Sequence, residues 1–110
     1  MSNLTAFVVL VVAALLEVGG DAVVRSGLFA PGFARKVSLV LLGGLLLTVY
    51  GVVVNTPKWD FGRLLGVYVV LFFVTAQIIN FVGFHVRPGP PVLLGGVLIV
   101  AGGLVMTLWN

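Results

Sequence analysis

The chain has 110 residues, of which 61% are hydrophobic and 8% are charged, and its mean hydropathy is +1.29. A soluble domain of this size cannot bury so many apolar side chains in its core, so the remaining apolar surface must face lipid. There is no cysteine and a single histidine, which excludes disulfides, thiolate metal sites and a histidine-rich metal site. The net charge of +3 is dispersed in short loops, which favours membrane anchoring over nucleic-acid binding.

Four apolar runs reach or approach the length of about 20 residues that a membrane span needs. We predict spans at residues 4–24, 37–54, 64–84 and 92–109, separated by turn-forming residues. The last break, residues 87–91, is predicted to be a stiff hairpin because proline fixes φ and donates no hydrogen bond. The first run has no basic residue before it, so we expect a permanent helix and not a signal peptide. The fold class is therefore an all-α membrane protein with a single four-helix domain.

The orientation signal is weak. With four spans, the first and third loops share one side of the membrane and hold four basic residues, whereas the other side holds two. The positive-inside rule slightly favours both termini outside, and insertion in both orientations is equally compatible with so small a bias. The residues on the first side are Arg25, Arg35, Lys36 and Arg87, and those on the second are Lys58 and Arg63.

Glu17 lies within the first apolar run, with Asp21 one helical turn later and Arg25 one turn after that. An ionised carboxylate in hydrocarbon costs several kcal/mol, so such a residue usually faces a cavity or a partner and has a function. A carboxyl group in this position can exchange a proton for a cation. The alternative is a permanent ion pair with Arg25 or with a cation of another chain, but Arg25 is about 12 Å away along the helix axis. We therefore predict that Glu17 is the proton and substrate site.

Asp21 has two interpretations. It is spaced to form an ion pair with Arg25, or it could share a proton with Glu17 as a coupled acid pair. Two carboxylates alone do not make a specific metal site, so no metal and no cofactor are expected.

Tyr68 and Tyr50 lie near the ends of their spans. Each could be an interfacial anchor or the wall of a site for an organic cation. Polar side chains of the third span are expected to bond across helices. These are Thr75 and Asn80. Three charged residues are interpreted as solvated loop charges, and they are Lys58, Asp60 and Arg63.

Glycine doublets recur in three of the four spans. Small residues on one helix face let another helix approach closely in lipid. In the second span, we expect Gly44 and Gly51 to pack within the chain. In the fourth span, we expect the doublets to contact a second chain. These predicted dimer-interface residues are Gly95, Gly96, Gly102 and Gly103.

These residues resemble the small multidrug resistance transporters. The similar segments are Ala-Leu-Leu-Glu17-Val-Gly, the basic residue Arg25 two turns later, the loop Gly32-Phe-Ala-Arg35, and the glycine heptad of residues 96–103. Gly62-Arg63 followed by Tyr68 is closer to the related YnfA-like proteins.

The resemblance implies an antiparallel, dual-topology homodimer that exchanges protons for organic cations. It implies that Glu17 binds proton and substrate in turn, and that Ala13 and Gly20 line its helix face. Tyr68 stands where the multidrug members have a tryptophan. Asp21 stands where they have a small or polar residue. Both departures suggest a divergent substrate.

We therefore expect a proton-coupled exporter of small organic cations in the inner membrane, acting as a homodimer. One alternative is a flippase, or flippase subunit, for a lipid-linked substrate. Another is a non-catalytic accessory protein. An enzyme is not expected, because no nucleophile–base set, metal-ligand set or phosphate loop is recognisable.

Overall fold

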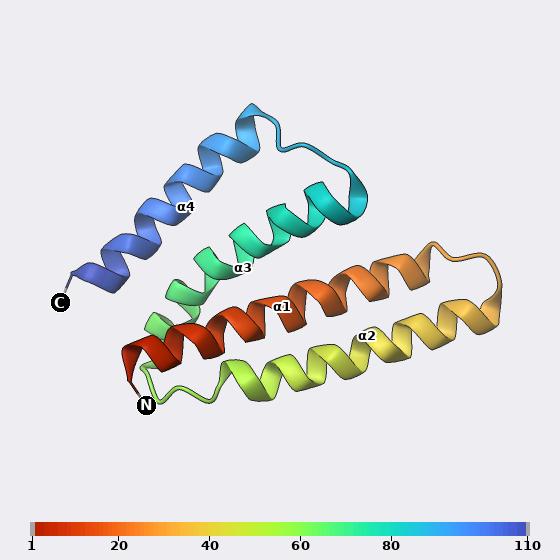
Figure 1. Ribbon diagram of the computed structural model, residues 1–110, viewed down its shortest axis with the longest axis horizontal. Coiled ribbons are helices and arrows are strands. Elements are labelled where there is room, and N and C mark those ends of the chain that lie inside the picture. The colour runs from red at the N-terminus through yellow and green to blue at the C-terminus, as the bar shows by residue number, and fades with distance from the viewer. Residues whose placement is uncertain (1, 110) are drawn as a thin grey trace. The chain divides into compact units, whose positions relative to one another are not determined.

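The computed structural model describes residues 2–109 and folds them into four α-helices (Figure 1). All four are long and apolar enough to cross a membrane. The predicted all-α membrane fold with four spans is therefore confirmed. The helices are α1 (Asn3–Leu28), α2 (Phe33–Val54), α3 (Phe61–Phe84) and α4 (Pro90–Leu108).

The helices extend beyond the predicted spans, mostly at their amino-terminal ends. The largest difference at a carboxyl end is in α1, which continues through the Ser26-Gly27 pair that was predicted to end it. The reason is that Gly27 packs against α2, where a Cβ atom would lie 2.9 Å from the Cβ of Leu39 and 3.1 Å from the backbone nitrogen of Val40. This contact offsets the cost of about 1 kcal/mol that glycine carries inside a helix.

The helix ends are capped by polar groups. The Ser2 hydroxyl accepts a hydrogen bond from the backbone N–H of Thr5 at 3.1 Å, and the Asp60 carboxylate accepts one from the N–H of Arg63 at 3.0 Å. Helix α3 ends at His85, whose φ of 57° lies in the left-handed region. Helix α4 begins with two prolines, which lack the N–H groups that a first turn leaves unbonded.

Hydroxyl groups within the spans bond to their own helix. Thr48 donates to the carbonyl of Gly44 at 3.0 Å, and Thr107 donates to the carbonyl of Gly103 at 2.8 Å. Such bonds satisfy the hydroxyl where no water is available. These two side chains therefore need no partner on another helix.

The chain divides into two compact units, Met1–Thr56 and Pro57–Asn110. The first contains α1 and α2, and the second contains α3 and α4; each is a helical hairpin with a short loop (Figure 1). The single four-helix domain stays a prediction.

The first hairpin is held by a close approach of α1 and α2 at Gly20 and Gly43. A Cβ atom on Gly43 would lie 2.5 Å from the side chain of Val24 and 2.8 Å from the carbonyl oxygen of Gly20. A Cβ atom on Gly20 would lie 3.0 Å from Leu47. Only glycine allows the two backbones to come this close, as is common between helices in lipid.

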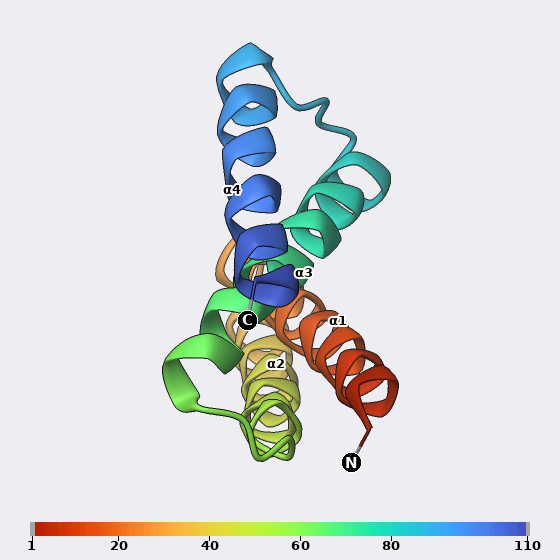
Figure 2. The same cartoon turned by 90° about the vertical axis from the view of Figure 1, so that its left-hand side faces the viewer.

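The second hairpin is packed at one end only. Gly66 of α3 accommodates the sulfur of Met106, and Gly103 of α4 accommodates Val70. Farther along, Gly96 lies against the ring of Phe73. Beyond this point α3 and α4 diverge towards their connecting loop (Figure 2).

In every glycine doublet, one residue packs against the other helix of its hairpin and its neighbour has nothing within 4 Å. The packed glycines are Gly20, Gly43, Gly96 and Gly103, and the open ones are Gly19, Gly44, Gly95 and Gly102. Neighbouring residues point about 100° apart on a helix, so they cannot both face one neighbour. Gly44 and Gly51 do not contact α1, which Gly43 contacts instead, so their predicted packing within the chain is absent from the first hairpin and stays a prediction for the rest of the four-helix unit.

We predict that Gly43→Ala destabilises the first hairpin by about 1–3 kcal/mol, because the new methyl group meets backbone atoms that cannot turn away. Gly44→Ala is the matched control: its methyl group meets nothing, and alanine favours the helix by about 1 kcal/mol. Thermal unfolding of the two variants in detergent, followed by circular dichroism, measures the difference. Equal melting temperatures would show that the backbones are not in close contact here.

Candidate functional site

Glu17 lies near the middle of α1 and is half-buried. It is about 21 Å from the start of a helix that is about 39 Å long. Glu17 and Val24 are seven residues apart and therefore share one side of the helix. Because Val24 contacts Gly43, this is the side that turns towards α2. The carboxyl group thus belongs to the interior of the first hairpin, at the depth of the hydrocarbon.

Small residues flank Glu17 along the helix. Ala13 precedes it by one turn and Gly20 follows it by nearly one turn, and both are buried. Residues 13 and 20 are also seven apart, so they form a second line beside that of Glu17. Both side chains are small, and Gly20 is packed against Leu47 and Gly43 of α2. Ala13 and Gly20 are the residues that the resemblance places along the site.

Asp21 and Arg25 are both exposed. The guanidinium of Arg25 lies 5.4 Å from the ring centre of Phe29, an arrangement in which the ring attracts the cation. Within residues 2–109, no ion pair joins Arg25 to Asp21. Of the two interpretations of Asp21, neutralisation by Arg25 is therefore not the arrangement found. Sharing of a proton with Glu17 stays a prediction.

Tyr50 is half-buried on α2, and the register of the hairpin fixes its depth. Gly27 faces Val40 and Gly20 faces Leu47. Moving seven residues back along α1 therefore corresponds to moving seven residues forward along α2, as expected for antiparallel helices. The same register brings Tyr50 to the level of Glu17. Of the predicted site residues, this places Tyr50, Glu17, Ala13, Asp21 and Gly20 in one hairpin.

Tyr68 belongs to the other unit. It is 4% exposed, on the second turn of α3, and its ring centre lies 6.2 Å from that of Phe72. Both interpretations of its position, a membrane-surface anchor and a wall of the cation site, stay predictions.

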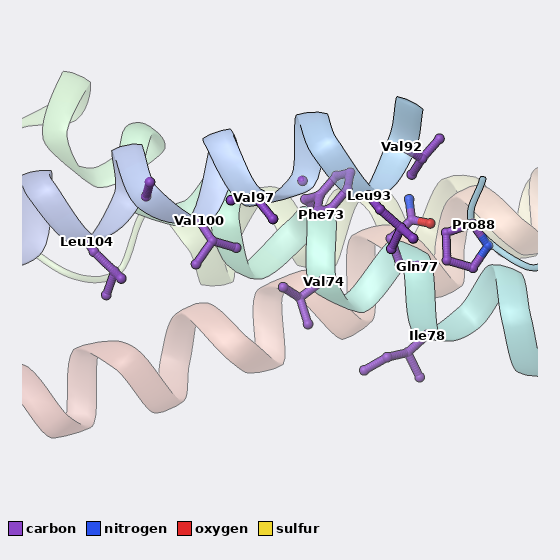
Figure 3. A pocket seen from close by; sticks show the side chains of 12 residues that line it. Phe73, Val74, Gln77, Ile78, Pro88, Val92, Leu93, Val97, Val100 and Leu104 are labelled. Carbon is purple, nitrogen blue, oxygen red and sulfur yellow. The ribbon is translucent and has the colours of Figure 1, made fainter. Parts of the chain in front are cut away.

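The second hairpin contains an apolar groove of about 560 Å³ between the diverging parts of α3 and α4 (Figure 3). Its volume is in the range of about 300–1,000 Å³ that is typical of small-molecule sites. Sequence reasoning missed this groove, because it depends on where the two helices separate. The lining residues used below are Phe73, Gln77, Pro88, Val100, Ala101 and Leu104.

Gln77 is the one lining side chain with an amide. The hydrogen bonds across helices that the sequence predicted for Thr75 and Asn80 are not found in the described part of the chain, and Gln77 has none there either. An amide in hydrocarbon gains free energy when it finds a partner. A ligand with a hydrogen-bonding group would supply one to Gln77.

Two of the residues that the sequence analysis interpreted as solvated loop charges make structural contacts. Asp60 caps α3. Arg63 donates from its Nε to the carbonyl oxygen of Met106 at 3.4 Å, which is one of the last carbonyls of α4, and its guanidinium lies 5.4 Å from the ring centre of Trp59. A cation at a helix carboxyl end is favourable. An aspartate just before an apolar run is a cap signal that could have identified Asp60; nothing in the sequence indicates the Met106 contact.

Among the described residues, no group of three histidine, cysteine, aspartate or glutamate side chains could hold a metal ion. The acidic side chains that share a face of α1 are Glu17 and Asp21, and two oxygen-donor side chains do not complete a coordination sphere.

The chain is similar to a UPF0060 membrane protein of Herpetosiphon aurantiacus. The two are 29% identical over 111 residues, which cover 99% of this chain and 98% of the relative. The structure has four apolar helices, and together with this similarity they identify the type of protein. The chain is a multi-pass membrane protein. UPF0060 proteins are the YnfA family, so the match supports the YnfA-like part of the resemblance. No protein-family model matches the chain, and no solved structure matches it.

We predict that Asp60→Ala costs about 1 kcal/mol of stability, because the first turn of α3 loses its cap. Asp60→Asn removes the same charge and keeps a capping oxygen, so it should unfold close to the wild type. Chemical unfolding of both variants in detergent micelles measures the effect. If the two variants lose stability equally, the carboxylate charge and not the cap is responsible.

Proposed function

We propose that this membrane protein is a YnfA-like exporter that exchanges protons for small organic cations. The observation that carries the proposal is the half-buried Glu17 in the middle of an apolar helix, on the side that faces α2. An ionised carboxylate is costly at that depth, and either a proton or a cation lowers that cost. The two therefore compete for one group, which is the minimum requirement for exchange.

The neighbours of Glu17 support binding of a small cation. The resemblance places the small residues Ala13 and Gly20 along the site, and Tyr50 lies at the level of Glu17 on α2. An aromatic ring attracts an organic cation through its face. Asp21, exposed one turn away, is proposed to share or tune the proton held by Glu17.

Exchange requires that the site opens to one side of the membrane at a time. Inverted repeats are a common way to build such a transporter, and one four-helix chain is too small to enclose a chamber and bury its polar groups. We propose that two copies assemble in opposite orientations, which the weak bias of basic residues would permit. Transport of this kind changes no covalent bond, so no enzymatic activity is proposed.

The proposal predicts that Glu17→Gln abolishes proton-coupled cation exchange, because glutamine keeps the shape of the side chain but cannot ionise. The measurement uses proteoliposomes with an imposed pH gradient, challenged with guanidinium, quaternary ammonium and polyamine cations. Currents that appear with one of these classes would also identify the substrate class.

Two controls make this test specific. Asp60→Asn removes a carboxylate that lies outside the spans, and it should leave exchange unchanged. Glu17→Asp keeps the acid but shortens it, and it should retain part of the activity. Exchange by Glu17→Gln at the wild-type rate would contradict the proposal.

The predicted dimer-interface glycines of α4 fall into two pairs. Gly96 and Gly103 pack against α3, whereas Gly95 and Gly102 have nothing within 4 Å. We predict that Gly102→Leu leaves the chain folded and lowers the dimer fraction by about tenfold, because Gly102 is open and available to another helix. Gly103→Leu should instead unfold the second hairpin, because Val70 occupies that space. Cross-linking in membranes reports the dimer, and circular dichroism reports the fold. A fully dimeric Gly102→Leu would place the interface elsewhere.

A further inference from the structure

The α3–α4 groove has a polar end and an apolar end. Gln77 and Pro88 lie at the end next to the loop, and Val100 and Leu104 lie at the opposite end (Figure 3). Gln77 is seven residues before the end of α3, or about 10 Å along the axis. The headgroup layer is roughly 5–7 Å thick on each side of the bilayer. With α3 (24 residues, about 36 Å) centred on a hydrocarbon core of about 30 Å, Gln77 lies about 7 Å beneath the headgroup layer, and its side chain can extend towards the ester groups of a phospholipid.

The loop at the polar end is basic. Arg87 directly precedes Pro88, which lines the groove, and both Arg87 and His85 are exposed. Helix α4 begins at this loop, so the positive end of its dipole lies there as well. A basic group near the membrane surface attracts anionic headgroups. In the described residues, no acidic side chain lies between the end of α3 and the end of α4 to oppose this charge.

We propose that the α3–α4 groove binds one anionic phospholipid of the surrounding leaflet. Arg87 holds its phosphate, the amide of Gln77 donates to an ester oxygen, and an acyl chain occupies the apolar part down to Leu104. This site lies within the second hairpin and is independent of exchange at Glu17. It fills the wedge where α3 and α4 separate and gives Gln77 a hydrogen-bond partner.

The groove suits a lipid better than a helix of a second copy. Helices approach each other in lipid through small residues, but most of the lining residues are bulky, and Gly96 is already covered by Phe73. The open glycines of α4, Gly95 and Gly102, do not line the groove. A flexible chain can fill an irregular apolar wedge that offers a rigid helix no close contact.

The test is native mass spectrometry of the purified full chain in non-ionic detergent, titrated with phosphatidylglycerol or with phosphatidylcholine. We expect one retained phosphatidylglycerol per chain and weaker retention of phosphatidylcholine. Arg87→Gln should weaken phosphatidylglycerol binding by about fivefold, as expected for the loss of one basic group. Arg35→Gln, the same change at the start of α2, should have no effect.

A second pair of variants tests the groove itself. Ala101→Phe fills it and should weaken binding of phosphatidylglycerol by roughly tenfold. Leu98→Phe adds a ring to an exposed position of α4 outside the groove and should bind like the wild type. Three outcomes would each overturn the proposal. The first is equal retention of the two lipids, and the second is unchanged binding in both Ala101→Phe and Arg87→Gln. The third is a dimer that forms only when lipid is removed and that Ala101→Phe abolishes.

Discussion

The first hairpin depends on the contact between Gly20 and Gly43. In lipid there is no hydrophobic driving force between helices, so close packing has to provide the attraction. Two glycines facing each other let the backbones of α1 and α2 come together, with the carbonyl of Gly20 2.8 Å from where a Cβ of Gly43 would be. This contact fixes the rotation of α1 about its axis, and with it the direction of every other residue on that helix.

The position of Glu17 follows from that rotation. It lies one turn before Asp21 and on the same line as Val24, which packs on Gly43. If α1 turned by half a revolution, the carboxyl group would face lipid, where its charged form is far less stable. The glycine contact and the acidic site are therefore linked. Gly43, which has no proposed contact with a substrate, thus helps to set the environment of the residue proposed to bind it.

Much of the fold could be predicted from the sequence, because it depends on the lengths of apolar runs. The four helices were predicted with boundaries that differ by a few residues. The continuation of α1 through Gly27 was missed, since turn-forming residues normally end a span and only the contact with Leu39 and Val40 explains the exception. The role of Arg63 was missed because the sequence does not reveal that a distant carbonyl, that of Met106, lies within reach of its side chain. The role of Asp60 as the cap of α3 was missed although an aspartate just before an apolar run is a recognisable cap signal.

The site was less predictable than the fold for a related reason. Glu17 is visible in the sequence because a lone acid in an apolar run is unusual, and Ala13 and Gly20 follow from the resemblance. The depth of Tyr50 requires the hairpin register, and the groove requires the divergence of α3 and α4. The doublets show the same limit: composition identifies the glycines, but which member of each pair faces the neighbouring helix depends on rotation.

The division within each doublet bears on how a chain this small can work. One glycine of a pair builds the hairpin, and the other remains open on a different face of the same helix. A helix with two small-residue faces can pack inside its own chain and against another chain at once, without exchanging one contact for the other. The open face of α4 at Gly95 and Gly102 lies outside the groove, so assembly and lipid binding need not compete. A transporter made of two copies would need this separation, because its hairpins must stay intact while the surfaces between the copies move.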